Sequence, residues 1–530
     1  MKLVKTCFIS LVLFSLVSCN HDSSIFDSSI ISSESSSENN SIKREDKQKN
    51  LELKDNYLTN LYGGINRLPS IGKSKIFVVP VTFSDFIIPS SKQNEIKDHL
   101  NKTFFGDSNQ TSWESVSSFY SKSSYQQLNI TGEVSDVYKA KNNLSYYINQ
   151  ARNYPVYSSN SILKEVYDYF FASNKYKISD FDSDQDGVID CVELIYLYPQ
   201  YGYEGTFPSY ITNRNLGSTD KGNLLWAYTY WYCGYDGYES KEDLVKYKAL
   251  GDYVWASYFF TNGSGEDKID AHTYIHETGH ALGLDDYYDG NSLTSPAGAV
   301  TMMANNICDL DPYSKYFLGW TSPYKFSNND FSDEKNEYTV TLKPFESSGD
   351  SLILATDSNN TPFDEYYILD YYTPTFLNEE DSLNEYPGNG LHGFDKSGIR
   401  VYKINSKLVK SDITFSEVSD VLDYDNITWN YSNGDFNMIY ASNTSYKYST
   451  SRDNPDLIKL ISSLGEDRSN KFTTPSYTGG TVVGDSKDLF QEGDTHLNDY
   501  FFDDGSLLKY SVEITNLSEE SATLTLRYTD

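Results

Sequence analysis

Cysteine and basic residues are scarce in this chain of 530 residues, and each shortage excludes a class of protein. Only five cysteines occur, scattered along the chain, and no two of them form a CxxC pair. This argues against a thiolate zinc site and against a disulfide scaffold. The 43 lysines and arginines face 75 aspartates and glutamates, which gives a formal net charge of -32. Such a charge repels phosphates, so we expect no nucleic-acid partner.

Long hydrophobic runs are scarce as well. Hydrophobic residues make up 38% of the chain and the mean hydropathy is -0.54, which excludes a protein with many membrane spans. An apolar run over residues 8–17 follows Lys2 and Lys5 near the N-terminus. It is short for a span, and this arrangement is typical of a signal peptide, here residues 1–19.

Residues 16–19, Leu-Val-Ser-Cys, resemble a bacterial lipobox, in which the cysteine is lipidated and becomes the mature N-terminus. We therefore expect Cys19 to carry a lipid anchor, which would hold the protein on the outer face of the bacterial membrane. The alternative is an ordinary signal peptide that is cleaved nearby, with Cys19 incidental.

The rest of the chain divides by composition into three parts. Residues 20–67 are rich in serine and then in mixed charge, which predicts a disordered tether. Strand-like and helix-like segments alternate over residues 68–330 and predict an α/β or α+β domain. Over residues 331–530, segments with a period of two are separated by Gly, Asn, Asp and Ser, which predicts an all-β, sandwich-like domain. The expected fold class is α+β.

Individual elements can be expected from periodicity. The sequence predicts helices over residues 113–125 and 161–172. It predicts strands over residues 75–83, 128–134, 192–198, 337–343, 366–370, 398–404 and 522–528.

Three of the seven histidines fall between residues 272 and 280. His276 and His280 are four residues apart and share one face of a helix. Two imidazoles placed in this way can bind one zinc ion at about 2.0–2.1 Å. Glu277 follows the first ligand, where it can reach a zinc-bound water without being a ligand itself. The sequence therefore predicts a zinc site with Glu277 as its catalytic residue.

A third ligand is expected just beyond the helix. His272 shares the helical register but lies about 12 Å from His280 along the axis, too far for one zinc ion. We expect it to support the site from outside or to face solvent. Gly283 suits a left-handed helix end, after which the chain can turn back and offer Asp286; Asp285 is the alternative. Two imidazoles, one carboxylate and one water make an open catalytic site.

The segment 276–289, HETGHALGLDDYYD, resembles the zinc motif of the immune inhibitor A family of secreted bacterial metallopeptidases, with the pattern HExxHxxGxxD. The resemblance extends on both sides of the motif and covers about residues 70–325, with its clearest flanking stretches at residues 78–86, 115–132 and 311–320.

The resemblance implies a metzincin-like zinc peptidase domain within residues 68–330, with aspartate instead of histidine as the third zinc ligand. It also implies a methionine turn beneath the zinc, at Met302 or Met303. Three tyrosines are candidates for a donor to the oxyanion: Tyr287, Tyr288 and Tyr313. Residues 224–228 are a candidate for the edge strand that binds substrate.

The expected activity is hydrolysis of peptide bonds in extracellular proteins by a zinc-activated water. Glu277 would take the proton of the water and then deliver it to the leaving amine. One alternative is a calcium-stabilised surface binding protein or adhesin whose peptidase fold is inactive. Another is a zinc hydrolase that acts on a substrate other than a peptide.

A second metal site is expected at residues 182–193, DSDQDGVIDCVE, which match the calcium-loop pattern D-x-D-x-D-G with Asp at position nine and Glu at position twelve. The following run, residues 192–198, has the pattern of a strand and not of the helix found in an EF-hand. We expect structural calcium, and the alternative is an acidic surface loop. The predicted ligands are Asp182, Asp184, Asp186, the carbonyl of Val188, Asp190 through water, and Glu193, which has the weakest support.

Overall fold

The computed structural model describes most of the chain after residue 46. The described residues are 47–61, 68–152, 154–203, 205–212, 224–232, 239–262, 268–332, 334–412, 418–422, 424, 427–429, 431, 435–444, 455–474, 481–494 and 502–529. The chain clusters into two units, residues 1–41 and 42–530, and every described residue belongs to the second. The predicted signal peptide, Cys19 and residues 20–46 lie outside the described residues. No helix within the described ranges has the length and hydrophobicity to cross a membrane.

A six-stranded sheet forms the core of the first half, in the order β2-β1-β4-β6-β5 with β3 beside β1. All of its pairings are parallel except that of β5 with β6, so β5 is an antiparallel strand at one edge. The strands are β1 Gly72–Thr82, β2 Leu128–Val134, β3 Tyr138–Lys139, β4 Cys191–Tyr196, β5 Tyr228–Trp231 and β6 Asp252–Ser257.

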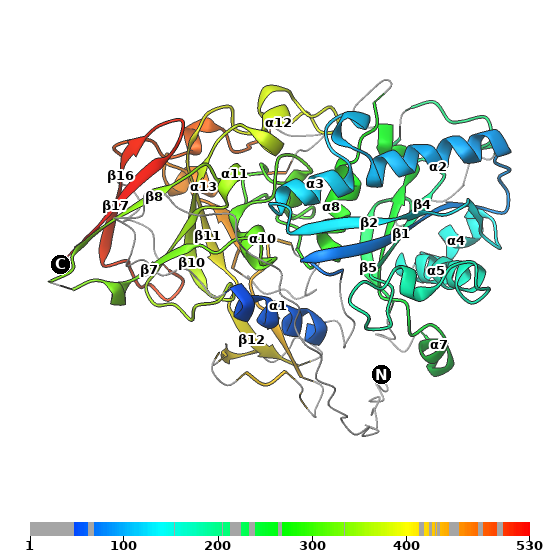
Figure 1. Ribbon diagram of the computed structural model, residues 1–530, viewed down its shortest axis with the longest axis horizontal. Coiled ribbons are helices and arrows are strands. Elements are labelled where there is room, and N and C mark those ends of the chain that lie inside the picture. The colour runs from blue at the N-terminus through cyan, green and yellow to red at the C-terminus, as the bar shows by residue number, and fades with distance from the viewer. Residues whose placement is uncertain are drawn as a thin grey trace, which may run out of the picture. The chain divides into compact units, whose positions relative to one another are not determined.

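Helices cover both faces of this sheet because its strands are apolar on both sides. In β1, Ile76 and Val78 belong to one hydrophobic cluster, whereas Phe77 and Val79 belong to another on the opposite face. Figure 1 shows α2 and α3 on one side of β1 and β2, and α4 and α5 on the other. The helices of this half are α2 Ser90–Phe105, α3 Val116–Ser123, α4 Leu144–Gln150, α5 Val156–Phe170, α7 Lys241–Lys246, α8 His272–Ala281, α9 Met302–Asn305 and α10 Pro312–Phe317.

The second half is rich in strands. It also contains short helices, which the prediction of an all-β domain did not include. A five-stranded sheet, β15-β11-β10-β9-β7, shares a hydrophobic cluster with a three-stranded sheet, β16-β17-β8, and a third sheet is β13-β12-β14. The elements are β7 Tyr324–Ser327, β8 Glu337–Leu342, α11 Phe345–Ser348, β9 Ser351–Ala355, β10 Glu365–Tyr372, α12 Glu379–Leu383, β11 Gly398–Asn405, β12 Leu408–Ser411, β13 Val418–Val421, β14 Phe436–Ile439, β15 Ile458–Leu460, α13 Glu466–Ser469, β16 Tyr510–Leu517 and β17 Ala522–Tyr528.

The fold is therefore a mixture of helices and several sheets, compatible with the predicted α+β class. Every strand expected from periodicity exists in the structure, and β2 and β17 have the predicted limits. The two expected helices exist as α3 and α5. The candidate edge strand is displaced along the chain, since β5 begins at Tyr228 where the expected segment ends.

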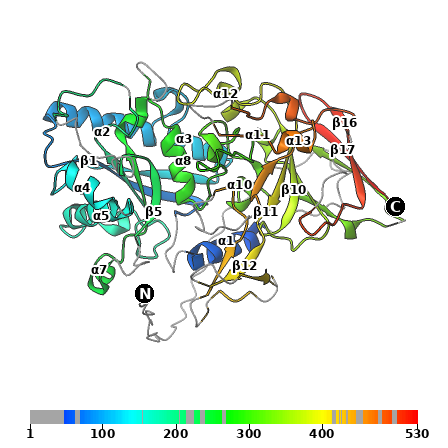
Figure 2. The same cartoon turned by 180° about the vertical axis from the view of Figure 1, so that it is seen from behind.

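The prediction of a disordered tether is wrong for its last part, because residues Lys47–Leu61 form helix α1. This helix contacts β14 and α10, and it lies beside β12 in Figures 1 and 2. Tyr57 and Leu58 are buried at 2% and 4% exposure. Tertiary packing outweighs the weak local signal of a polar, mixed-charge segment, as is usual for helices of this length.

The two halves share a core across the predicted boundary at residue 330. One hydrophobic cluster contains Met302 and Tyr313 together with Ile368 and Tyr402. Backbone groups around the turn at residues 302–309 are also bonded to the second half. Cys308 N donates to Asp381 (2.6 Å), Asp309 N donates to Asn378 (2.9 Å), and Asn389 donates to the carbonyl of Asn305 (2.7 Å).

Candidate metal centre

Helix α8 carries the HExxH residues across the sheet beside its edge. It contacts β5 and β6, and Tyr274 and Ile275 anchor it in the hydrophobic cluster on that face. The helix ends at Ala281, and Gly283 follows with φ +102°, as expected of a left-handed cap. The backbone can therefore reverse within a few residues and bring Asp286 back to the two histidines.

The structure brings His276, His280 and Asp286 together, with one ligand atom from each within 4.8 Å of the others. Nε2 of His276 lies 3.2 Å from Asp286 Oδ1, and Nε2 of His280 lies 3.4 Å from the same oxygen. A tetrahedral zinc ion with bonds of about 2.0–2.1 Å separates its ligand atoms by about 3.3–3.4 Å. Both distances to Asp286 suit a tetrahedral zinc ion, and Asp286 rather than Asp285 completes the group.

Both imidazoles are oriented by main-chain carbonyls. Nδ1 of His276 lies 2.9 Å from the carbonyl oxygen of Met302, and Nδ1 of His280 lies 2.8 Å from that of Leu284. A proton on each Nδ1 satisfies these bonds and leaves each Nε2 as the lone-pair donor. Met302, one of the two methionines expected near the site, therefore contacts the group through its carbonyl.

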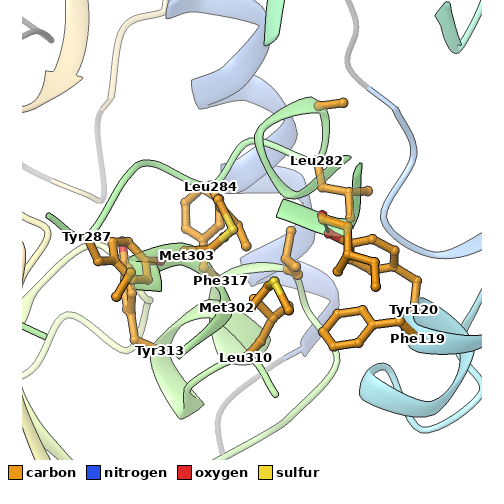
Figure 3. Close-up of a cluster of buried hydrophobic side chains, with 14 of the residues drawn as sticks. Phe119, Tyr120, Leu282, Leu284, Tyr287, Met302, Met303, Leu310, Tyr313 and Phe317 are labelled. Carbon is orange, nitrogen blue, oxygen red and sulfur yellow. Dashed lines mark hydrogen bonds between the residues drawn. The ribbon is translucent and has the colours of Figure 1, made fainter. Parts of the chain in front are cut away.

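Met303 packs from below against the middle of α8. A Cβ at Gly279 would lie 2.5 Å from Met303 Sδ, so a larger residue there would require the methionine side chain to shift. Leu284, Tyr287, Met302 and Met303 belong to one buried cluster, drawn in Figure 3. The floor of the metal site is thus closely packed.

His280 and Asp286 each favour the charged form of the other, and His276 also favours the charged form of Asp286. Burial lowers the pKa of His280, but the carboxylates of Asp286 and Glu277 outweigh burial and raise it to about 9. Burial likewise raises the pKa of Asp286, but His280 and His276 outweigh it and hold that pKa well below the usual carboxyl range. A cation at this site would compete with a proton for the His280 imidazole.

Glu277 is buried at 6% exposure beside the group, and it lines the adjoining cleft. Burial raises the pKa of Glu277, although the two imidazoles oppose the shift. The hydroxyl of Thr229 in β5 lies 3.0 Å from Glu277 Oε2 and 2.7 Å from its carbonyl oxygen, as donor to both. One carboxylate oxygen is thereby held in place while the side chain borders the cleft.

The cleft has a volume of about 290 Å³ and runs between β5 and the turn after α8. Trp226, at 53% exposure, Trp231 and Thr444 also line it, so the second half contributes to its wall. The aromatic rings provide apolar contact surface next to the polar group. Its lining residues are Trp226, Ala227, Tyr228, Thr229, Trp231, His276, Glu277, His280, Leu284, Asp285, Asp286, Tyr288 and Thr444.

Of the three tyrosine candidates, only Tyr288 lines this cleft. Its ring centroid is 6.5 Å from that of His276. The hydroxyl of Tyr287 is buried and paired with Ser314 at 2.7 Å, and Tyr313 is buried at 2% exposure within the core. Tyr287 and Tyr313 are therefore packing residues.

His272 does not face solvent, which corrects one of the two expectations for it. It is buried at 3% exposure, and its Nδ1 lies 2.8 Å from Asp270 Oδ1. Its ring stacks on Trp113 at 4.5 Å and packs against Tyr386 at 4.2 Å. Tyr386 also donates to Asp270, so the start of α8 is tied to the second half.

The structure brings together some of the predicted calcium ligands. Oxygens of Asp182, Asp184 and Asp190 lie within 4.8 Å of one another. Gly187 has φ +88°, as the sharp turn of such a loop requires. Burial, together with the charge of Asp186, raises the pKa of Asp184 to about 6. Oxygen donors of this kind suit a hard cation such as calcium.

Asp186 and Val188 lie in the same loop but outside this three-carboxylate group. The Asp186 carboxylate accepts a hydrogen bond from Val188 N at 2.7 Å. Asp190 is buried and accepts bonds from Ser183 N at 2.9 Å and Lys75 N at 2.8 Å. Several carboxylate oxygens of the loop are thus used by its own backbone.

The prediction of Glu193 as a calcium ligand is wrong. Glu193 belongs to β4, where alternate residues point to opposite faces, and it shares the face of Cys191 and Ile195 that α8 covers. Its carboxylate is fully buried, with Oε1 3.4 Å from the hydroxyl of Thr278. Burial and then Glu277 raise the pKa of Glu193 well above its usual value.

Sequence reasoning missed Thr229, Trp231 and the role of the Met302 carbonyl, whereas Trp226 lies within the candidate segment 224–228. Thr229 reaches Glu277 only because β5 pairs with β6 beside α8. No spacing within the sequence signals such a contact, which arises from pairing between strands.

Comparison with known proteins adds no assignment to this geometry. A search of protein-family models gives no match to the chain, and a search of curated proteins gives none either.

Proposed function

We propose that this chain is a zinc-dependent endopeptidase with a metzincin-like catalytic domain, as its resemblance to the immune inhibitor A family implies. The observation that carries the proposal is the group formed by His276, His280 and Asp286, in which Asp286 Oδ1 lies 3.2 and 3.4 Å from the two imidazoles and all three residues line one cleft. These three residues would hold the zinc ion. When bound, zinc supplies a Lewis acid that polarises a carbonyl group and acidifies water.

Glu277 acts as the general base and acid. Its position next to the ligands allows it to accept the proton of the attacking water and to deliver that proton to the leaving nitrogen. The raised pKa of Glu277 suits both steps, since it brings the carboxyl closer to neutral pH. Thr229 restrains one of the two carboxylate oxygens.

Strand β5 provides a binding edge for an extended peptide. It is the last strand in the described part of this sheet, and its residues line the cleft. A peptide that adds to this edge gains main-chain hydrogen bonds regardless of sequence. Trp226 and Trp231 would contact its side chains, and Tyr288 would reach the oxyanion with its hydroxyl.

Casein cleavage by Glu277→Ala tests the proposal. We expect the variant to retain zinc and to lose cleavage by at least about 10³-fold, because only proton transfer is removed. Glu242→Ala, at an exposed site in α7, is the matched control and should cleave like the wild type. Undiminished cleavage by Glu277→Ala would refute the mechanism. A wild type that binds zinc but cleaves no protein would favour the surface-binding or non-peptide alternatives.

We further propose that Cys19 anchors the enzyme to the outer face of the bacterial membrane, where its substrates would be extracellular proteins or peptides. Labelled palmitate should be incorporated by the wild type and not by Cys19→Ala. Incorporation that survives the substitution would point to another attachment site.

We also propose that Asp182, Asp184 and Asp190 hold a structural calcium ion. The closely spaced oxygens of the three carboxylates and the positive φ of Gly187 support it.

A further inference from the structure

Helix α1 packs against two glycines, each of which follows a helix of the first half. Gly283, after α8, has φ +102°, and a Cβ there would lie 2.8 Å from both δ-carbons of Leu58. Gly319, after α10, has φ +77°, and a Cβ there would collide with Leu51. The two leucines are seven residues apart, two turns along the same face of α1. The helix therefore touches the chain at both of these helix ends.

The contact at Gly283 lies at the start of the turn that carries the third ligand. The turn that begins at Gly283 carries Leu284, whose carbonyl orients His280, and then Asp286. Tyr57 borders the back of this turn, in a space of only about 10 Å³. Side chains of α1 thus pack against the turn that carries Asp286.

The position of α1 is fixed from other directions as well. The ring of Tyr57 packs edge-on against Phe317 at 6.4 Å and against Phe363 at 5.2 Å. Asn60 accepts a hydrogen bond from Asn437 N at 2.9 Å and donates to the carbonyl of Trp429. The helix is therefore bonded to the second half while Leu58 presses on the ligand turn.

We propose that α1 is a positioning element of the zinc site, and that Leu58 holds the turn at the distance that lets Asp286 complete the ligand set. Asp286 stands on a loop, and loop ligands depend on their surroundings for position. Without the Leu58 side chain, the turn at Gly283 can relax towards α1 and withdraw Asp286 from the imidazoles. This inference rests on the proposed function for the identity of the metal.

Zinc affinity of the full-length chain tests this role. Leu58→Ala should raise the zinc dissociation constant roughly tenfold, in the range expected when a group that supports a ligand is lost. Leu51→Ala is the matched control, since it removes the same side chain from the same helix at Gly319. Both variants should melt at a lower temperature, but Leu51→Ala should change zinc affinity less than about twofold. Leu58→Met, which keeps the volume, should restore affinity.

The absorption spectrum of the cobalt-loaded protein gives a second readout. Its d–d bands report coordination geometry, so they should change in Leu58→Ala and not in Leu51→Ala. Should Leu58→Ala fail to fold, Leu58→Val and Leu51→Val make the same comparison with a smaller loss of volume.

Equal zinc affinities in the Leu58 and Leu51 variants would overturn the inference while the proposed function stands. A wild type that binds zinc and cleaves casein, with Leu58→Ala unchanged in both respects, would have the same meaning. A wild type that binds no zinc would overturn the proposed function and this inference together.

Discussion

The group on α8 and the loop at residues 182–190 both gather metal-binding side chains, but they hold them differently. At α8, both histidines are fixed by main-chain carbonyls, and a packed turn supplies the third ligand. In the loop, Asp182 accepts hydrogen bonds from Asp186 N at 3.1 Å and Gly187 N at 3.0 Å. One site is supported from outside by the core, whereas the other is supported by its own backbone.

This difference shows what each kind of support can do. Outer partners leave the ligand atoms free for a metal and fix their direction, which favours a catalytic ion that must keep an open position. Bonds within a loop compete for the same oxygens that a cation would use. They keep the loop folded without the ion, which suits a site that adds stability.

Asp286→Asn is the strongest test of the contrast. We expect the zinc dissociation constant to rise by at least about 100-fold, because a direct ligand is lost rather than a supporting partner. Asp285→Asn, one residue earlier, should bind zinc within about threefold of the wild type. Competition with a chelator of known affinity measures both, and equal losses would show that Asp285 contributes to the site as much as Asp286 does.

Tyr288→Phe should mainly affect the chemical step. Loss of a hydroxyl that stabilises the oxyanion should lower kcat about 100-fold and leave KM nearly unchanged. Tyr287→Phe is its neighbour and control, since that hydroxyl is buried against Ser314. Steady-state peptide hydrolysis separates the two, and the assignment fails if both variants keep the wild-type kcat.

Asp184→Asn should have a smaller effect, which concerns the stabilisation of the protein by calcium. If the loop holds calcium, the ion should raise the melting temperature of the wild type by about 2–4 °C, and this rise should vanish in the variant. Asp186→Asn should retain most of the rise, because Asp186 stands outside the three-carboxylate group. Scanning calorimetry with and without calcium measures the shift, and a wild type indifferent to calcium would remove the second metal site.

Glu193→Gln should have the smallest effect on calcium, since Glu193 lies under α8. The calcium-dependent shift should stay within about 1 °C of the wild-type value. Burial raises the pKa of Glu193 well above its usual value, which favours the protonated form that glutamine resembles. As pH rises above the ordinary glutamate value, the wild type should lose stability relative to the variant. Urea unfolding across pH detects this, and a reversed trend would indicate a charged Glu193.

The shared face of His276 and His280 on helix α8 could be predicted because its geometry is local. The i, i+4 spacing of His276 and His280 fixes their common face before any tertiary contact forms. Gly283 likewise signals the reversal that brings in Asp286. The strands were predictable for the same reason, since alternation of side chains is a property of each strand alone.

What could not be predicted depends on partners distant in the chain. The calcium-loop pattern assigns Glu193 by counting, but entry into β4 turns that side chain to the other side of the sheet. Helix α1 carries buried Asn50 and Lys54 and few apolar residues, so its own sequence resembles a linker. Only its docking on α10 and β14 accounts for its order.

The bonds from Asn378, Asp381 and Asn389 to the turn at residues 305–309 set the smallest piece of this protein that can work. A chain that stopped at residue 330 would leave three groups of that turn unmatched, directly below the carbonyl that aims His276. The first half therefore depends on the carboxy-terminal half for the structure of this turn. Recombination that exchanged the carboxy-terminal half for the equivalent part of another protein would need to restore all three side chains at once.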